Sequence, residues 1–386
     1  MAERPSWIEI DLRAVERNYA ELQRLAGTGR RVIASIKANA YGHGMLDIAR
    51  VLERSGVFAL WTGHVPEALA LRAAGIRARI LMFGGYLPEA IPGLLRHDLT
   101  PTIYDRQGLA AAAAAGGRSA APVCVKVDAG LGRLGVPLAD ARRFIGEVAR
   151  TPSVRLKGVY THLPFGTGEG MHWAASSAPG FERLLAELRA DGIMPEITQL
   201  WGSSGLVAGL ADGTSAVCVG HLLYGLLPVV ASIARPIRLE PVCTGIKSHL
   251  IHVARHRAGA DLAIGGRYRL AGATTVGVIP LGYGDGMPSP VQGASAEVLV
   301  RGTRAPIVGV SLEHTVLDLS RVSASAVGDE ATLVGSSGND RITLEECAGQ
   351  FGCTPLSLMM SFSGRLASRP VAVAGTEPAA VAMVGE

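Results

Sequence analysis

Cysteine is scarce in this chain, and the five cysteines are widely spaced: Cys124, Cys218, Cys243, Cys347 and Cys353. No two of them form a C-x-x-C pair, and no histidine follows His314, so Cys353 has no metal-binding partner nearby in the sequence. An odd, scattered set of cysteines is typical of reduced thiols. We therefore expect a cytoplasmic protein without a structural metal site.

Long apolar runs are also absent. No stretch approaches the ~18 apolar residues of a membrane-spanning helix, and the opening MAERPSWIEIDL lacks the apolar core of a signal peptide. Aromatic residues make up 5% of the chain, and its net charge of +4 forms no basic stripe. This composition argues against a nucleic-acid surface and against a membrane partner.

The chain is long enough, and apolar enough, for two domains with a sizeable core. It has 386 residues, of which 48% are hydrophobic. Up to about residue 236, short apolar strands alternate with helix-length segments. The expected strands are 31–36, 57–61, 79–83, 123–127 and 154–160, and the expected helices are 45–55, 66–74, 88–96, 138–150 and 181–191. Repeated βα units predict a parallel sheet, and this many favour an α/β fold with a closed (β/α)8 barrel.

After Pro236 the pattern changes to short strands bounded by Gly, Pro and Asp, which predicts a mostly β domain over 237–370. Strands are expected at 242–253, 274–280, 296–300, 305–312 and 331–334, with helices only at 343–349 and 356–364. The segment 371–386 is rich in Ala, Val, Gly and Pro, and we expect a loose tail.

A lysine stands directly after the first apolar strand, in the segment IKANAYGHG (36–44). In a (β/α)8 barrel this places Lys37 at the carboxyl ends of the strands, where catalytic residues collect. A desolvated lysine has a lowered pKa, and its neutral amine forms a Schiff base with a carbonyl cofactor. A lysine that leans out into solvent is the alternative.

Six further motifs accompany this segment. One precedes it, WIEIDLRAVERNY near the start, and five follow it in order: VKVDAGLGRLG (125–135), VYTHLPFG (159–166), WGSSG (201–205), GHLLYGL (220–226) and PLGYGDGM (280–287). Together with IKANAYGHG they resemble the alanine racemase family, whose members have the type III fold of pyridoxal phosphate (PLP) enzymes. The resemblance covers nearly the whole chain, so it is far more specific than any one motif.

The resemblance implies PLP as the cofactor and a free amino acid as the substrate. Lys37 would hold PLP as the internal aldimine and act as an acid–base group at Cα. Tyr41 would lie beside the phosphate, which Ser204, Gly220 and the backbone of His221 would also hold. Arg133 would meet the phenolic oxygen of PLP, although a surface arginine is the alternative, and His162 would lie against the ring unless it is a core histidine. The family also implies a homodimer in which the β domain contributes to the partner's active site.

Racemisation needs two bases, one on each face of Cα. The second base of the family is a tyrosine in a short turn of the β domain. The matching segment here is LAIGGRY (262–268), and the tyrosine position falls on Ile264, which cannot move a proton. Tyr268 could replace it only if the alignment shifts.

Other departures concern the cofactor ring and the substrate entrance. Cys218 stands where the family has an arginine facing the pyridine nitrogen, so the electronic setting of the cofactor is open. The substrate-pocket triplet reads Ser311, Leu312 and Glu313, and the usually basic entrance positions are Ser289 and Gly309. Tyr283 and Asp285 are kept, and a late phosphate-binding tyrosine falls on Leu356.

These departures leave three functional interpretations open. The first is an amino-acid racemase, by family an alanine racemase. The second is one-base PLP chemistry, namely elimination or replacement, aldol cleavage or decarboxylation. The third is a degenerate family member without catalysis. His221 and His314 are additional acid–base candidates, and we expect the neighbouring Glu313 to orient and charge His314.

Overall fold

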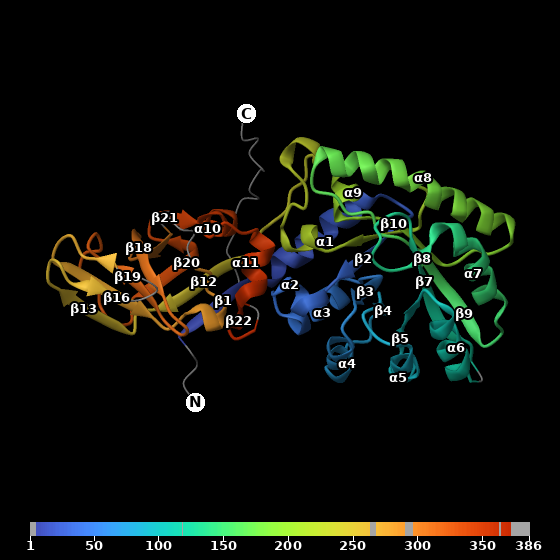
Figure 1. The fold of residues 1–386 in the computed structure, drawn as a ribbon, viewed down its shortest axis with the longest axis horizontal. Coiled ribbons are helices and arrows are strands. Elements are labelled where there is room, and N and C mark those ends of the chain that lie inside the picture. The colour runs from blue at the N-terminus through green and yellow to red at the C-terminus, as the bar shows by residue number, and fades with distance from the viewer. Residues whose placement is uncertain (1–4, 118, 263–267, 290–295, 363, 372–386) are drawn as a thin grey trace. The chain divides into compact units, whose positions relative to one another are not determined.

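The computed structural model describes residues 5–117, 119–262, 268–289, 296–362 and 364–371. The chain divides into two compact units, of which one contains residues 13–40 and 45–240, and the other contains residues up to 12, 41–44 and those from 241. The two units are described separately below (Figure 1).

A parallel β-barrel forms the core of the first unit. Its strands follow the order β5-β4-β3-β2-β11-β10-β9-β7-β6, and β8 (Val136–Pro137) pairs with β7 outside this path. The strands are β2 (Arg31–Ser35), β3 (Ala59–Thr62), β4 (Ile80–Met82), β5 (Leu99–Thr100), β6 (Thr102–Ile103), β7 (Ala121–Asp128), β9 (Val154–Tyr160), β10 (Ile197–Gly202) and β11 (Ala216–Val219). Only Pro101, which has no N–H, separates β5 from β6, so this one segment closes the ring between β4 and β7. The predicted (β/α)8 barrel is confirmed.

Helices cover the outside of the barrel (Figure 1). The described part of the unit contains α1 (Leu12–Ala26), α3 (Met45–Arg54), α4 (Val65–Ala73), α5 (Ile91–Arg96), α6 (Arg106–Ala115), α7 (Leu138–Arg150), α8 (Gly168–Ala190) and α9 (Ser203–Ala208). The helix expected at 181–191 is longer than predicted. It begins after Thr167, whose hydroxyl accepts a hydrogen bond from the N–H of Gly170, and it continues through Pro179.

The second unit is mostly β, as predicted. Its larger sheet has the order β13-β16-β19-β18-β17-β20-β12-β1-β22, and β21 pairs with β20. These strands are β1 (Ser6–Asp11), β12 (Cys243–His249), β13 (His252–His256), β16 (Thr274–Ile279), β17 (Glu297–Val300), β18 (Thr303–Val310), β19 (Thr315–Asp318), β20 (Glu330–Ser337), β21 (Asp340–Ile342) and β22 (Ala367–Val371). The pair β14 (Asp261–Leu262) and β15 (Tyr268–Arg269) lies apart, and α10 (Leu344–Gln350) and α11 (Pro355–Phe362) are its described α-helices.

Two features of this sheet differ from the sequence expectations. The segment 242–253 forms two strands rather than one, because the chain leaves β12 at Leu250 and re-pairs with β16 from His252. The first strand, β1, pairs with β12 and β22 and therefore belongs to the β unit, although residues 1–236 were expected to form the barrel domain. An N-terminal strand carries no local signal of which distant strands it will join.

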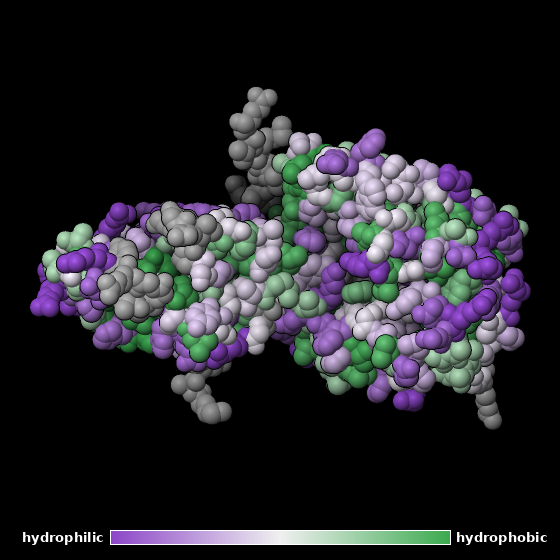
Figure 2. Space-filling view, viewed as in Figure 1, coloured by the Kyte–Doolittle hydropathy of each residue, from purple (hydrophilic) through white to green (hydrophobic). Residues whose placement is uncertain are grey.

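The surface of each unit is chemically mixed. On the face in Figure 2, hydrophilic residues dominate and apolar residues are scattered among them. Within the described residues, no helix is long and apolar enough to cross a membrane.

Candidate active site

Lys37 lies where the sequence predicts it, directly after β2 at the carboxyl ends of the barrel strands. The N–H of Ile36 donates to the carbonyl of Trp61 on β3 at 3.0 Å, which fixes the backbone just before the lysine. Beneath it the barrel is filled by packed side chains: Ile33, Ala59, Trp61, Leu81, Cys124, Tyr160, Ile197 and Ala216. The Lys37 Nζ atom lies 5.5 Å from the ring centroid of Phe83. The barrel interior is therefore a packed core rather than an open channel.

The pKa of Lys37 is lowered from its ordinary value. Burial of the amine is the main cause, the positive charge of Arg133 adds to it, and the nearby Cys218 thiol acts in the opposite direction. A lower pKa increases the fraction of neutral amine, which is the form that attacks a carbonyl group or accepts a proton.

Other cationic and titratable groups gather around Lys37. Burial, with a smaller contribution from Arg133, lowers the pKa of Lys126, on β7, to about 8. Burial together with Lys126, Arg133 and Lys37 lowers the pKa of His162 to about 3. The pKa of His221 is also lowered, by burial and then by Lys37. The structure thus brings Lys37, Arg133, His162 and His221 together, in a mouth where positive charges repel one another.

Lys126 is a member of this site that the sequence analysis missed. It is only 4% exposed, and its Nζ lies 6.0 Å from the centroid of the Tyr160 ring. The signal was present in the sequence, since a lysine between Val125 and Val127 interrupts a run of buried β-strand residues. Lysines are seldom buried without a partner, so the position of Lys126 within an apolar strand made it a candidate functional residue, like Lys37.

A tight loop after β7 presents Arg133. The Oδ1 atom of Asp128 accepts hydrogen bonds from the N–H groups of Gly130 at 3.0 Å and Gly132 at 3.1 Å. Gly135 has a φ of +137°, and a Cβ atom at this position would lie 2.6 Å from the backbone nitrogen of Asp128. The loop conformation that carries Arg133 therefore requires glycine at this position.

The predicted phosphate-binding residues lie at the ends of two neighbouring strands. Ser204 is in the first turn of α9, after β10, and its hydroxyl donates to the carbonyl of Phe165 at 2.7 Å. Gly220 follows β11, and its N–H donates to the hydroxyl of Ser203 at 3.0 Å. To donate to a phosphate, the Ser204 hydroxyl has to turn away from Phe165.

Cys218, on β11, packs against the apolar interior of the barrel. Burial raises the pKa of its thiol to about 12, so the group is neutral at physiological pH. The resemblance places a positively charged arginine at this position, and this chain has an uncharged thiol there instead.

The remaining predicted residues belong to the β unit. Tyr41 belongs to that unit and is 6% exposed. Ile264 lies outside the described residues. The entrance candidates are close to one another, because the N–H of Tyr283 donates to the carbonyl of Ser311 at 3.0 Å and the N–H of Gly284 to that of Leu312 at 2.8 Å.

The expected pairing of Glu313 with His314 is wrong. The Glu313 carboxylate lies 3.6 Å from the Arg365 guanidinium, which also contacts Asp285 at 3.3 Å. The described structure contains no hydrogen bond or ion pair between Glu313 and His314; the backbone of His314 instead bonds with Ser311. The arginine draws the carboxylate away from the histidine.

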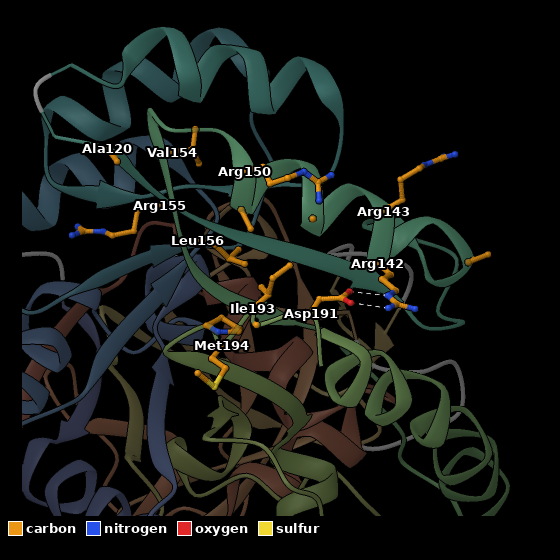
Figure 3. A pocket seen from close by; sticks show the side chains of 15 residues that line it. Ala120, Arg142, Arg143, Arg150, Val154, Arg155, Leu156, Asp191, Ile193 and Met194 are labelled. Atoms are coloured by element: carbon orange, nitrogen blue, oxygen red, sulfur yellow. Dashed lines mark hydrogen bonds and ion pairs between the residues drawn. The ribbon is translucent and has the colours of Figure 1, made fainter. Parts of the chain in front are cut away.

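A separate groove of about 1100 Å³ lies at the other end of the barrel, between α7, the start of β9 and the segment after α8 (Figure 3). Arginines line it, but Arg142 forms two hydrogen bonds with Asp191, at 2.8 and 2.9 Å, and Arg143 pairs with Asp140. The titratable cluster is at the mouth instead, which makes the mouth the candidate active site. Within the described residues, no group of His, Cys, Asp and Glu could hold a metal ion.

Comparison with known proteins gives a consistent result. Two family models match, "Alanine racemase, N-terminal domain" over residues 10–228 and "Alanine racemase, C-terminal domain" over residues 243–369. A protein named alanine racemase from Syntrophobacter fumaroxidans is 34% identical over 350 residues, which cover 89% of this chain and 91% of the relative. The crystal structure of alanine racemase from Bacillus anthracis with bound L-Ala-P has a TM-score of 0.87 and 26% identity, and the match covers 96% of each chain.

The fold and the site define a (β/α)8-barrel enzyme with an amine at the carboxyl ends of its strands and a separate β unit. The chain belongs to the alanine racemase family. It is accordingly a racemase-like enzyme, an isomerase by class, in a family whose members depend on PLP.

Proposed function

We propose that this chain binds PLP and acts through Lys37 at the Cα atom of a free amino acid, with racemisation of alanine as its first expected reaction. The observation that carries the proposal is the Lys37 amine at the barrel mouth, whose pKa is lowered mainly by burial. PLP, when bound, supplies an aldehyde for the amine and withdraws electrons from Cα.

The residues at the mouth fit such a ligand. The positive charge of Arg133 lowers the pKa of both Lys37 and Lys126, Lys37 also lowers that of Lys126, and an anionic ligand would offset this repulsion. The Ser204 hydroxyl, Gly220, Tyr41 and the backbone of His221 are proposed to hold the phosphate. Arg133 is proposed to face the phenolic oxygen of PLP, and His162 its ring.

Lys37 is the proposed acid–base group on one face of the substrate. Its neutral Nζ would accept the proton from Cα and return it, and the lowered pKa makes this neutral form more accessible near neutral pH. Inversion additionally needs a proton delivered to the opposite face. The expected tyrosine position, Ile264, has no proton to deliver.

One-base chemistry is the second candidate function, and the neutral Cys218 thiol beside Lys37 favours it. A thiol in place of an arginine removes a fixed positive charge from the site and so changes the electronic environment of a bound cofactor. Elimination or replacement, aldol cleavage and decarboxylation can each proceed with a single acid–base group, because none of them moves protons on both faces of Cα. A family member that binds PLP without turnover is the remaining alternative.

The visible absorption spectrum of the purified protein with PLP, before and after single D- and L-amino acids are added, tests the proposal. A band that shifts with particular amino acids supports it and identifies the substrate class. Chiral analysis in deuterated water then separates the candidates: racemisation inverts and labels Cα, whereas one-base chemistry labels it without inversion or releases a different product. A protein that never develops a band contradicts the proposal.

We further propose a cytoplasmic homodimer in which the β unit serves the partner's active site. Tyr283, Ser311, Leu312, Glu313 and His314 would then line the substrate entrance. The exposed fractions of Tyr283 and Leu312, 57% and 54%, support this arrangement, because exposed apolar side chains in a turn suit an interface. Analytical ultracentrifugation measures the oligomeric state directly.

A further inference from the structure

The backbone immediately after Lys37 has an unusual conformation. Ala38, Asn39, Ala40 and Tyr41 have φ values of +53°, +52°, +55° and +55°, so four consecutive residues other than glycine are left-handed. Each such residue costs roughly 1–2 kcal/mol relative to the right-handed form. A turn of this kind persists only where surrounding contacts hold it.

Glu67, in the first turn of α4, provides two of those contacts. Its Oε1 atom accepts a hydrogen bond from the backbone N–H of Asn39 at 2.8 Å, and its Oε2 atom accepts one from the hydroxyl of Thr62 at 2.8 Å. Thr62 ends β3 and is fully buried, so this anchor belongs to the rigid barrel wall. Hydrogen bonds to a carboxylate are stronger than those between neutral groups.

Asn39 connects the turn to the following helix as well. Its Oδ1 atom accepts a hydrogen bond from the N–H of Met45, the first residue of α3, at 2.9 Å. Within the turn, the N–H of Ala40 donates to the carbonyl of Ile36 at 2.9 Å. Glu67 thus binds a residue that also connects the turn to α3.

We propose that Glu67 is a positioning residue for Lys37. The end of β3 fixes the backbone on both sides of the lysine: Trp61 accepts from Ile36 before it, and Thr62 acts through Glu67 on Asn39 after it. The direction in which the Lys37 side chain leaves the barrel wall therefore depends on this carboxylate. The role rests on the proposed function of Lys37 and deepens it, because small displacements of a reacting group cost large factors in rate.

Two measurements on the full chain test the role, with Glu67→Ala, Glu67→Gln and the control Glu89→Ala. The first is hydrogen–deuterium exchange of the Asn39 amide without cofactor, and the second is the rate at which borohydride traps PLP on Lys37. Glu67→Ala should accelerate exchange and slow trapping by about tenfold or more, as expected for loss of a hydrogen bond to a charged group. In Glu67→Gln, the exchange rate of the Asn39 amide and the trapping rate should both return most of the way to wild type, because the glutamine amide can accept from Asn39 and donate to Thr62. Glu89, exposed before α5, should behave as wild type when replaced.

Unchanged Asn39 exchange and unchanged trapping per folded molecule in Glu67→Ala would overturn the role, even if the melting temperature falls. If Glu67→Ala does not fold, Thr62→Val should show the same two changes to a smaller extent, because it removes the Oε2 contact. This variant also removes the longer hydrogen bond, 3.4 Å, that the Thr62 hydroxyl accepts from the N–H of His64. Wild-type rates of Asn39 exchange and of PLP trapping in both Thr62→Val and Glu67→Gln would then leave no role for the carboxylate. A wild-type chain that traps no PLP contradicts the proposed function instead, while the exchange rates still decide whether Glu67 holds the turn.

Discussion

At the scale of single residues, the Lys37 amine is the group on which the proposed chemistry depends. Lys37→Ala should abolish the visible absorbance that develops with PLP, and borohydride should attach no cofactor to the chain, because no other neutral amine occupies that position. Lys157→Ala is the matched control, since Lys157 pairs with Glu196 at 3.0 Å, away from the site. A band that persists in Lys37→Ala would show that the lysine is misassigned.

The second residue-scale prediction concerns Ile264, which lies outside the described residues. If the chain lacks only the second base, Ile264→Tyr should raise alanine racemisation by about a hundredfold or more, the usual contribution of a positioned general base. Chiral chromatography of the product, with Ile264→Phe as the control for ring size, measures the effect. No gain over Ile264→Phe would mean that Cys218 or the substrate pocket also prevents inversion.

Single residues also show where sequence reasoning succeeds. Lys37 could be placed because a polar residue at the end of an apolar strand is a local feature. Glu67 was missed because its importance depends on the turn at Asn39, which folding brings beside it. Lys126 had a local signal in its strand, but the effect of Lys37 and Arg133 on its pKa depends on the fold. The Glu313–Arg365 contact likewise joins residues far apart in the sequence.

At the scale of elements, the left-handed turn after β2 predicts a stability gain from glycine. Ala38→Gly removes the Cβ atom that disfavours this conformation, at the cost of a more flexible unfolded chain. Because Ala38 is exposed, little packing is lost, and we expect the free energy of unfolding to rise by about 0.5–1 kcal/mol. Ala114→Gly, exposed near the end of α6, should lower it by a similar amount. Urea denaturation measures both, and a loss of stability at position 38 would contradict the argument.

Elements with a strong local pattern were predicted well. The strand 154–160 and the helix 138–150 have the predicted bounds, because their apolar spacing is uninterrupted. The first half of α8 was missed, since small and polar residues from Gly168 to Gly180 give little apolar periodicity, and Pro179 argues locally against a helix. The cap at Thr167 and burial of Ala174 and Ala178 stabilise that half instead.

At the scale of the barrel as a whole, charge is distributed differently at its two ends. At the amino ends of the strands, Glu196 accepts from Arg79 at 2.8 Å, Lys157 at 3.0 Å and Arg31 at 3.3 Å, and Arg79 and Lys157 lower its pKa to about 2. At the carboxyl ends, Arg133 lowers the pKa of Lys37 and of Lys126, and the opposing effect of Asp128 on Lys126 is smaller than that of Arg133. Charges are paired at the amino ends of the strands, whereas cations repel one another at the carboxyl ends. An anionic ligand is therefore expected at the barrel mouth.

This arrangement makes the stability of the cofactor-free protein depend on pH. A histidine in the unfolded chain takes up a proton near pH 6.5, whereas the folded state lowers the pKa of His162 to about 3. Between these values the unfolded state binds more protons, so the stabilisation is complete above about pH 6.5 and is lost as the pH falls toward 3. Near pH 5 this one group contributes a slope of about 1.4 kcal/mol per pH unit. His221, whose pKa is also lowered, acts in the same direction.

His162→Gln should therefore flatten the fall in the free energy of unfolding between pH 6 and pH 5, without removing the part that His221 contributes. Glu196 is unchanged in the variant, so any protons that its carboxyl group takes up near pH 5 affect wild type and His162→Gln equally. Urea denaturation at pH 7, 6 and 5 measures the slope, and His172→Gln, which removes an exposed histidine from α8, is the control. Equal slopes in His162→Gln and wild type would show that the ring at position 162 is solvated, and that the cations at the mouth do not act on it.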